Sequence, residues 1–200
     1  MRALQKRFYK LASNYSNNNA TIAALWMELE ELYGSKRRFY HTLEHLEYIY
    51  EVLSGFELSD ALEFAIFYHD SIYFSKNNEE QSAVLAQKRL SLLGVPRSLI
   101  KDVVTMILDT KTHIASKEQN ILFLDADIAI LGASSQEYNQ YAKNIQKEYS
   151  YLSPSVYKRG RKQVLENFLK QKRLFKSDYF FSTREEQARA NIEHELLLLG

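Results

Sequence analysis

The sequence of 200 residues predicts an all-α fold in a single domain. Three observations indicate this class. The chain has only six glycines and two prolines, so it offers few positions for tight turns. Apolar residues recur at the three- and four-residue spacing of a helix face through most of its length. Capping residues precede several of these segments and glycines follow them, as is typical of helix ends.

The first third of the chain predicts four helices. Residues 4–12 form the first. Thr21 is expected to cap the second, which ends at Gly34, and the segment FYHTLEHLEYIYEVL forms the third. We expect Ser59 to cap the fourth. Its residues at offsets 0, 3, 4 and 7 form a core-facing stripe that consists of Leu62, Ala65, Ile66 and His69.

The middle of the chain predicts two helices, a connector and one apolar segment. Asn78 is expected to cap a helix over residues 79–93, and another helix covers residues 98–109. Residues 110–119 form the connector. The segment ILFLDADIAILG, at residues 121–132, suits either a buried strand or a helix, and its helical neighbours favour a helix.

The last third of the chain predicts three more helices, at about residues 134–149, 157–174 and 183–199. Ser134 and Glu137 have the spacing of a capping box at the start of the first. Pro154 interrupts the chain after it. Thr183 and Glu186 form a second candidate capping box.

The composition excludes several classes of function. Lys and Arg number 26 and Asp and Glu number 25, so a wide basic surface for nucleic acid is not expected. The absence of cysteine excludes disulfides, thiolate zinc sites and a cysteine nucleophile. No N-terminal apolar run suits a signal peptide, and no window reaches the roughly 18 apolar residues of a membrane span. We therefore expect a cytoplasmic protein.

One histidine–aspartate pair stands out, because the stripe of the fourth helix ends on His69 and Asp70. Burying an imidazole and a carboxylate costs free energy unless each finds a partner. That partner is either a metal ion or a hydrogen-bond network. Candidate ligands precede the pair, since His41 and His45 are four residues apart on a predicted helix and share one face.

Further candidates follow the pair. His113 lies in the connector, and Asp125 and Asp127 lie in the most apolar segment of the chain. His194 falls in a charged part of the last helix and is expected on the surface. Singly, such residues usually have ordinary structural roles. Together they form a mixed nitrogen and oxygen set that suits a divalent metal ion.

The order of these residues resembles the HD phosphohydrolase superfamily, with a histidine, then His-Asp about two dozen residues later, then a distal aspartate. More narrowly, the chain from Trp26 to Leu199 resembles a family of metal-dependent HD phosphohydrolases of unassigned substrate. The segments that carry the resemblance are RFYHTLEHL, AIFYHDSIY, NNEEQSA, LDADIAILG, Glu148-Tyr149, Gly160-Arg161 and ARANIEHEL. It implies an HD-type helical bundle, with a metal-site core at about residues 36–132 and C-terminal helices at about residues 134–199.

The resemblance implies one metal ion held by a histidine, the His-Asp pair and the distal aspartate. On this chain the histidine is His45 or His41, and the pair is His69 and Asp70. We favour His45, whose spacing to His69 suits the pattern better. His41 is then expected either to support the metal ligands without binding the metal or to contact the substrate.

The distal aspartate is Asp127 or Asp125. We favour Asp127, because Leu124, Asp127 and Ile128 share one helical stripe, whereas Asp125 is placed to cap that helix. Only His113 is available for a second metal, so we expect one tight ion and, at most, a weak second one. Mixed imidazole and carboxylate ligation favours Mn²⁺, Fe²⁺, Co²⁺, Zn²⁺ or Ni²⁺ over Mg²⁺.

Such a site predicts hydrolysis of a small phosphorylated metabolite or nucleotide by a metal-activated water. Besides Asp70, the candidate catalytic residues are Glu79, on the apolar face of its helix, and His113, as a proton donor or phosphate contact. The simpler alternative for Glu79 is compensation of the helix dipole. Basic residues that are candidates for binding the substrate are Arg38, Lys76, Lys111 and Arg161. Arg161 is equally placed to pair with Glu148 as a structural strut.

The expected partner is therefore a small phosphorylated molecule, nucleotides included. Neither a membrane nor an extended nucleic acid is expected, and the sequence leaves homo-oligomer formation open. Three other interpretations compete with hydrolysis. They are a non-catalytic HD-fold module that senses a ligand, a two-iron oxygenase, which the missing second-metal histidine disfavours, and an unrelated helical bundle with a polar core.

Overall fold

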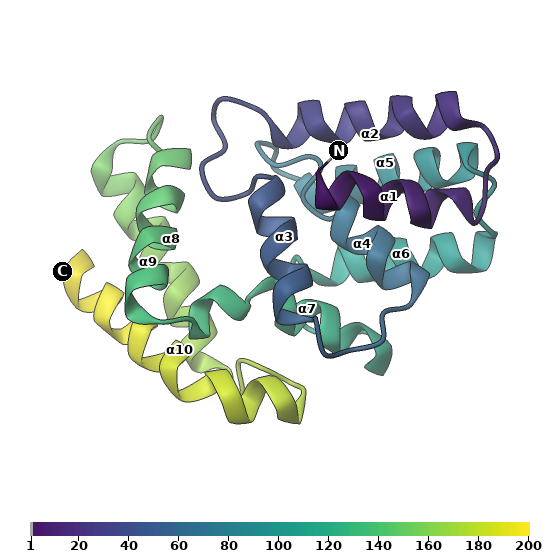
Figure 1. Ribbon diagram of the computed structural model, residues 1–200. Coiled ribbons are helices and arrows are strands. Elements are labelled where there is room, and N and C mark those ends of the chain that lie inside the picture. The colour runs from purple at the N-terminus through teal and green to yellow at the C-terminus, as the bar shows by residue number, and fades with distance from the viewer. Residues whose placement is uncertain (1) are drawn as a thin grey trace. The chain divides into compact units, whose positions relative to one another are not determined.

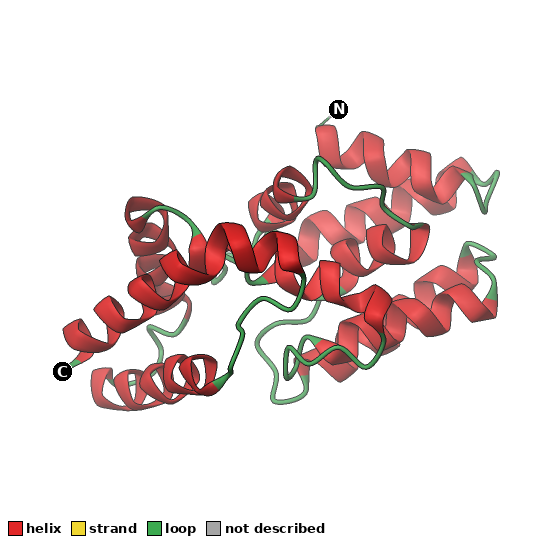
Figure 2. Cartoon of the chain, turned by 90° about the horizontal axis from the view of Figure 1, so that it is seen from below, coloured by secondary structure: helices red, strands yellow, loops and turns green. Residues whose placement is uncertain are grey.

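The computed structural model describes residues 2–200, which form ten α-helices and two short 3₁₀ helices, with no strand among them (Figures 1 and 2). The predicted all-α class is confirmed. The elements in order are α1 (Ala3–Ser13), α2 (Asn19–Tyr33), α3 (Leu43–Val52), α4 (Asp60–Tyr68), α5 (Asn78–Leu92), α6 (Arg97–Asp109), η1 (Glu118–Asn120), α7 (Ile121–Asp127), η2 (Ala129–Gly132), α8 (Ser135–Glu148), α9 (Pro154–Lys170) and α10 (Asp178–Leu199).

The chain forms two compact units, one that ends at Leu124 and one from Asp125 to Gly200. The first unit holds α1 to α6, and the second holds η2 and α8 to α10. The boundary falls within α7. The proposed division into a core at residues 36–132 and C-terminal helices within one domain stays a prediction.

In the first unit α4 is the helix against which α1, α3, α5 and α6 all pack (Figure 1). Its residues from Phe64 to Tyr68 have no exposed surface. A helix that is apolar all round is stable only inside a core, so α4 is buried on every side rather than along a single stripe. Ser59 caps it by accepting a hydrogen bond from the backbone N–H of Leu62, as predicted.

An aromatic cluster fixes the C-terminal half of α4. The ring of Phe67 lies edge-on to Phe8 of α1 at 5.1 Å and to Trp26 of α2 at 6.4 Å. Such edge-to-face pairs add about 0.5–1.5 kcal/mol each to the free energy of area burial. The hydroxyl of Tyr33 donates to the carbonyl of Phe67 at 3.1 Å. Helices α1 and α2 therefore hold the end of α4 from which His69 follows.

In the second unit α10 packs on η2 and α9, and α8 packs on η2. The Nδ2 of Asn191 donates to the carbonyls of Leu131 and Ala133, which flank the end of η2. Gly132 lies so close to α10 that a Cβ there would fall 2.6 Å from the backbone oxygen of Arg184. Only glycine permits this approach.

Several helices begin at residues other than those predicted from the sequence. Asn18, not Thr21, caps α2, since its side chain accepts from the N–H of Thr21. Asn78 does not cap α5 but is its first residue. Helix α10 begins at Asp178 and is capped by Ser177, so Thr183 lies within the helix.

The predicted starts of α10 and α9 differ from the structure for reasons that Thr183 and Pro154 show. Thr183 donates to the carbonyl of Tyr179 one turn earlier, so its hydroxyl serves a helix interior instead of a capping box. The expected break between two helices is present before Pro154, but α9 begins at Pro154 itself and not at about residue 157, because the first turn of a helix does not need the missing N–H of proline. The capping box of Ser134 and Glu137 is confirmed.

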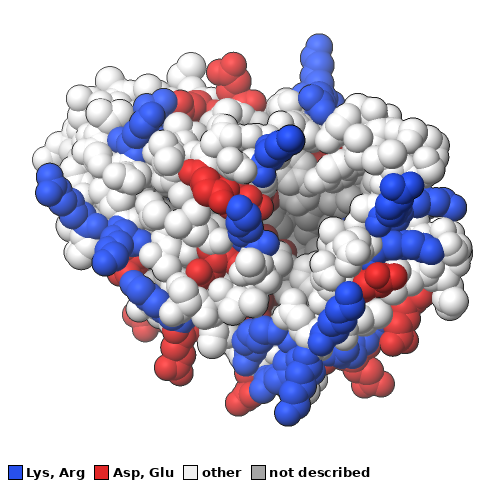
Figure 3. All heavy atoms as spheres, turned by 180° about the vertical axis from the view of Figure 1, so that it is seen from behind, with Lys and Arg blue, Asp and Glu red and all other residues white. Residues whose placement is uncertain are grey.

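Charged side chains are interspersed on the face of the molecule shown in Figure 3, where Lys and Arg alternate with Asp and Glu. This distribution agrees with the near balance of 26 basic and 25 acidic residues. Within residues 2–200, no helix is both long and apolar enough to cross a membrane.

Candidate metal centre

The His-Asp pair lies at the C-terminal end of α4, where His69 is the C-cap. The Nδ1 of His69 lies 3.0 Å from the carbonyl oxygen of Ile66. A carbonyl can only accept, so this contact places the proton on Nδ1 and leaves the lone pair on Nε2. A backbone carbonyl commonly orients a metal-binding histidine in this way.

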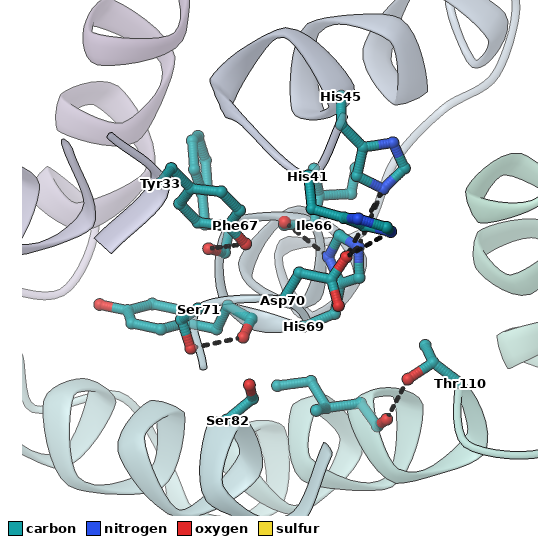
Figure 4. A network of polar contacts seen from close by, with 12 residues as sticks. Tyr33, His41, His45, Ile66, Phe67, His69, Asp70, Ser71, Ser82 and Thr110 are labelled. Carbon is teal, nitrogen blue, oxygen red and sulfur yellow. Dashed lines mark hydrogen bonds and ion pairs between the residues drawn. The ribbon is translucent and has the colours of Figure 1, made fainter. Parts of the chain in front are cut away.

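His45 comes from the first turn of α3 and faces His69 (Figure 4). Thr42 caps α3, since its hydroxyl oxygen accepts from the N–H of Glu44, and this cap sets where the helix starts. The Nε2 atoms of His45 and His69 lie 3.2 Å apart, and both residues are almost fully buried. A proton or a cation between these nitrogens removes the repulsion between their lone pairs.

Asp70 completes the group. Its Oδ2 lies 3.3 Å from the Nε2 of His69 and 3.9 Å from the Nε2 of His45 (Figure 4). Two ligand atoms of one tetrahedral ion, each bonded at about 2.0–2.1 Å, lie roughly 3.3 Å apart. Two of the three separations match this value and the third is longer. His45, His69 and Asp70 therefore form a buried group that can hold a metal ion.

One side of the group is more open than the other. The side chains of His45 and His69 are each 1% exposed, whereas those of Asp70 and His41 are 14% and 16% exposed. The imidazoles thus close the inner side, and the carboxylate lies towards solvent.

His41 does not lie on a helix with His45, and the prediction that the two share one helical face is wrong. Thr42 is the N-cap, so His41 precedes α3. Its Nε2 nevertheless lies 3.8 Å from the Oδ2 of Asp70, close to the corresponding distance for His45. The ring of His41 stacks on Tyr73 at 4.1 Å with an interplanar angle of 28°. Its predicted contact with the substrate stays a prediction.

The backbone after Asp70 is held from two sides. The guanidinium of Arg38 donates to the carbonyls of Asp70 and Ser71 at 2.7 and 2.9 Å. On the other side, the hydroxyl of Ser82 accepts from the N–H of Ile72 and donates to its carbonyl. Ser82 could be found from one sequence signal, a hydroxyl on the largely apolar face of its helix, whereas no such signal singles out Tyr73.

His113 lies in the connector in a left-handed conformation, with φ at 51°. Such a conformation is uncommon outside glycine and needs support from the surrounding structure. Asp109 supplies it, since its Oδ2 accepts from the N–H and hydroxyl of Ser116 and from the Nδ2 of Asn120. Sequence analysis missed Asp109, which looks like an ordinary residue at a helix end. The catalytic role of His113 stays a prediction.

Glu79 lies in the first turn of α5 and is partly exposed, and its role as a general acid or base stays a prediction. The adjacent Glu80 pairs with Lys111 of the connector. That hydrogen bond lowers the pKa of the Glu80 carboxyl and raises the pKa of the Lys111 amine. Lys76 is exposed in the loop before α5. Contacts of Lys76 and Lys111 with a substrate likewise stay predictions.

Asp125 does not cap its own helix, and that expectation is wrong, because the residue lies late in α7. Its buried carboxylate instead accepts hydrogen bonds from the N–H of Lys176 and from the N–H and hydroxyl of Ser177, just before α10. Burial raises the pKa of the Asp125 carboxyl, and these hydrogen bonds oppose the rise. Asp127 is the last residue of α7 and is partly exposed. Since it belongs to the second unit, its role as a ligand stays a prediction.

Arg161 is buried in the second unit, where its Nε and Nη2 donate to the two carboxylate oxygens of Glu195 at 2.8 and 2.9 Å. The hydroxyl of Tyr138 donates to the same carboxylate at 2.5 Å. Burial raises the pKa of Tyr138, so its hydroxyl keeps its proton. Arg161 is thus paired with Glu195, whereas its expected pairing with Glu148 and its expected contact with a phosphate both stay predictions.

No protein-family model, curated protein or solved structure matches this chain. The likeness to HD phosphohydrolases therefore rests on the sequence segments that carry it.

Proposed function

We propose that this chain is an HD-type, metal-dependent phosphohydrolase that acts on a small phosphorylated metabolite or nucleotide. The observation that carries the proposal is the buried convergence of His45, His69 and Asp70. The resemblance described above supplies the reaction class. The contact between the Nδ1 of His69 and the carbonyl of Ile66 supports the proposal, because it directs the lone pair of Nε2 towards His45 and Asp70.

In this proposal His45, His69 and Asp70 hold one divalent ion. Asp127 is the fourth ligand that the sequence resemblance implies. Imidazole and carboxylate together favour Mn²⁺, Fe²⁺, Co²⁺, Zn²⁺ or Ni²⁺ over Mg²⁺. Such an ion, when bound, polarises a phosphoryl oxygen and lowers the pKa of a bound water.

The chain's own residues would orient the substrate and move protons. Asp70 and His41, on the more open side, would face the phosphoryl group. Glu79 would exchange a proton at its carboxylate, and His113 would donate a proton to the leaving group. Lys76, which is exposed in the loop that follows the His-Asp pair, would attract the phosphate charge.

One observation favours the alternative of a non-catalytic ligand-sensing module. Three of the four basic residues predicted to contact phosphate already have protein partners. Arg38 donates to backbone carbonyls, Lys111 pairs with Glu80, and Arg161 pairs with Glu195. A sensor would keep the metal ligands yet would not need a full set of cations around a transferring phosphoryl group.

A hydrolysis screen separates the two functions. The purified chain is loaded in turn with Mn²⁺, Co²⁺, Zn²⁺, Ni²⁺ or Mg²⁺ and tested against p-nitrophenyl phosphate, bis-p-nitrophenyl phosphate and nucleoside mono-, di- and triphosphates. We expect a metal-dependent activity that a chelator removes. Asp70→Asn should lose it, whereas Asp178→Asn, at a carboxylate that is 98% exposed, should keep it. Equal activity in Asp70→Asn and the parent would refute the proposal. Metal binding without turnover on the whole panel would favour the sensor.

The expected partner remains a small phosphorylated molecule, with neither a membrane nor an extended nucleic acid involved. A cytoplasmic location and the formation of a homo-oligomer stay open to experiment.

A further inference from the structure

Arg38 makes an unusual set of contacts for a residue predicted to bind phosphate. It is only 7% exposed, and its guanidinium donates to three backbone carbonyls. A single nitrogen, Nη1, lies 2.9 Å from the carbonyl of His41 and 2.7 Å from the carbonyl of Asp70. The second nitrogen, Nη2, lies 2.9 Å from the carbonyl of Ser71. One cation therefore joins the segment before α3 to the turn after α4.

The ring contacts around Arg38 join the same two segments. Its guanidinium lies over the ring of Tyr33 at 4.9 Å and near that of Tyr73 at 5.5 Å. Tyr73, which follows the His-Asp pair, in turn stacks on His41. Burying a guanidinium costs free energy unless its donors are used, and here carbonyls and aromatic faces compensate for the lost water.

The three histidines around Asp70 are anchored in different ways. His45 is part of α3, and His69 ends α4 with its ring held by the carbonyl of Ile66. His41 lies in the segment between α2 and α3, outside any helix. The position of His41 therefore depends on the contacts of that segment more than the other two histidines do. The bond from Arg38 to the carbonyl of His41 and the stacking on Tyr73 are two such contacts.

We infer that Arg38 is a positioning residue that holds His41 against Asp70, rather than a substrate contact. By binding the carbonyls of both residues through one nitrogen, it sets the 3.8 Å approach of the His41 imidazole to the Asp70 carboxylate. The placement of His41 stands on the geometry alone. Its consequence for metal binding rests on the proposed function, in which Asp70 is a metal ligand and the His41 imidazole orients its carboxylate.

The first test reads the His41 ring without any metal. Imidazole C–H signals of the metal-free protein are recorded by NMR for the parent, Arg38→Met and Arg37→Met, with His41→Ala to assign the signal. The chain has only five histidines, so the signals can be resolved. Arg37 is a matched control, because it is the adjacent residue, is exposed, and lies over Phe74 at 4.2 Å.

We expect Arg38→Met to shift the His41 signals more than those of His45 and His69, since the ring would move relative to Tyr73. Arg37→Met should leave them near their parent positions. Unmoved His41 signals in a folded Arg38→Met protein would overturn the inference. If Arg38→Met does not fold, Arg38→Lys takes its place, because an amine cannot reproduce the planar fork that reaches three carbonyls. Parent-like His41 signals in Arg38→Lys would equally overturn it.

The second test measures Co²⁺ affinity from the visible absorption of the bound ion. Arg38→Met should weaken Co²⁺ binding by about 10–100-fold, as expected for a residue that orients the groups around a metal. Arg37→Met should stay within about twofold of the parent. In the double variant Arg38→Met/His41→Ala the two losses should not multiply, because both act through His41. Fully multiplicative losses would indicate a general structural role and overturn the inference.

Negative results in the two tests distinguish failure of the proposed function from failure of the inference about Arg38. A parent protein that binds no Co²⁺ would contradict the proposed metal function, and the NMR signals would then decide the positioning role of Arg38 alone. A parent that binds Co²⁺ together with an Arg38→Met variant that binds it equally well would overturn the inference and leave the proposed function standing.

Discussion

Replacing Asp125 by asparagine should destabilise the second unit by more than the loss of a helix cap. The carboxylate is 1% exposed and accepts three hydrogen bonds. One oxygen accepts a hydrogen bond from the N–H of Lys176 at 2.9 Å, and the other accepts from the N–H and hydroxyl of Ser177 at 2.7 and 2.6 Å. These contacts fix the chain where α10 begins.

An asparagine of the same size can satisfy only one side of this arrangement. If its oxygen faces Ser177, its amide group faces the N–H of Lys176, which is left without an acceptor. A buried donor left in this state costs about 1–3 kcal/mol, and the bonds that remain are weakened because the acceptor is no longer charged. Burial raises the pKa of the Asp125 carboxyl, which shows that burying its charge costs free energy. Replacing it by a neutral amide removes that cost and so offsets part of the lost stability. We expect a net loss of roughly 2–4 kcal/mol, against about 0.5–2 kcal/mol for a simple cap.

The assay is urea unfolding of metal-free protein, followed by circular dichroism at 222 nm. The fluorescence of Trp26, the single tryptophan, serves as a second probe that reports the first unit. Asp127→Asn is the matched control, since Asp127 lies two residues away and is partly exposed. It should lose less stability than Asp125→Asn but should fail to retain metal in elemental analysis. A loss below about 1 kcal/mol in Asp125→Asn would refute the reasoning that charged hydrogen bonds anchor the start of α10.

Three further predictions test other parts of the molecule. Glu79→Gln and His113→Ala should each retain the metal yet slow turnover by about 10²–10⁴-fold on any phosphoester that the parent hydrolyses, and parent-like kcat values would exclude them as proton-transfer groups. Glu195→Gln leaves the buried Arg161 without its carboxylate and should cost about 3–5 kcal/mol in urea unfolding, whereas a loss below about 1 kcal/mol would show that the pair is not a structural anchor. Burial and the hydrogen bond to Asp60 raise the pKa of Tyr15 from about 10 to about 12, so Tyr15 contributes stability that is complete below pH 10 and is lost as the pH rises towards 12. Tyr15→Phe should therefore lose less thermal stability than the parent between these pH values, and equal losses would contradict the assignment.

Much of the fold could be predicted because helix signals are local. The apolar residues of α4, its cap Ser59 and the capping box of α8 all act within a few residues of each other. The start of α10 could not be predicted in the same way. Thr183 and Glu186 imitate a capping box, but Ser177 supplies the cap, and the backbone before α10 is fixed by Asp125, more than fifty residues away in sequence.

In the candidate site, too, features that depend on residue type and local spacing could be predicted, and features that depend on distant contacts could not. His45, His69 and Asp70 could be predicted because their residue types and spacing carry the chemistry of a metal ligand set. The role inferred for Arg38 could not, because its acceptors are backbone carbonyls, which every residue has. The helical face shared by His41 and His45 was also predicted wrongly. Helix α3 starts after its cap Thr42, so His41 lies in the turn before the helix. From that turn its imidazole still approaches the carboxylate of Asp70.

The central claim is that His45, His69 and Asp70 hold one divalent metal ion. Elemental analysis after equilibrium dialysis against Mn²⁺ or Co²⁺ tests it most directly, with the parent, Asp70→Asn and the exposed control Asp178→Asn treated alike. We predict about one ion per chain in the parent and in Asp178→Asn, and little or none in Asp70→Asn. No bound ion in the folded parent, or an equal amount in Asp70→Asn, would contradict the claim and leave the group as a hydrogen-bonded polar core.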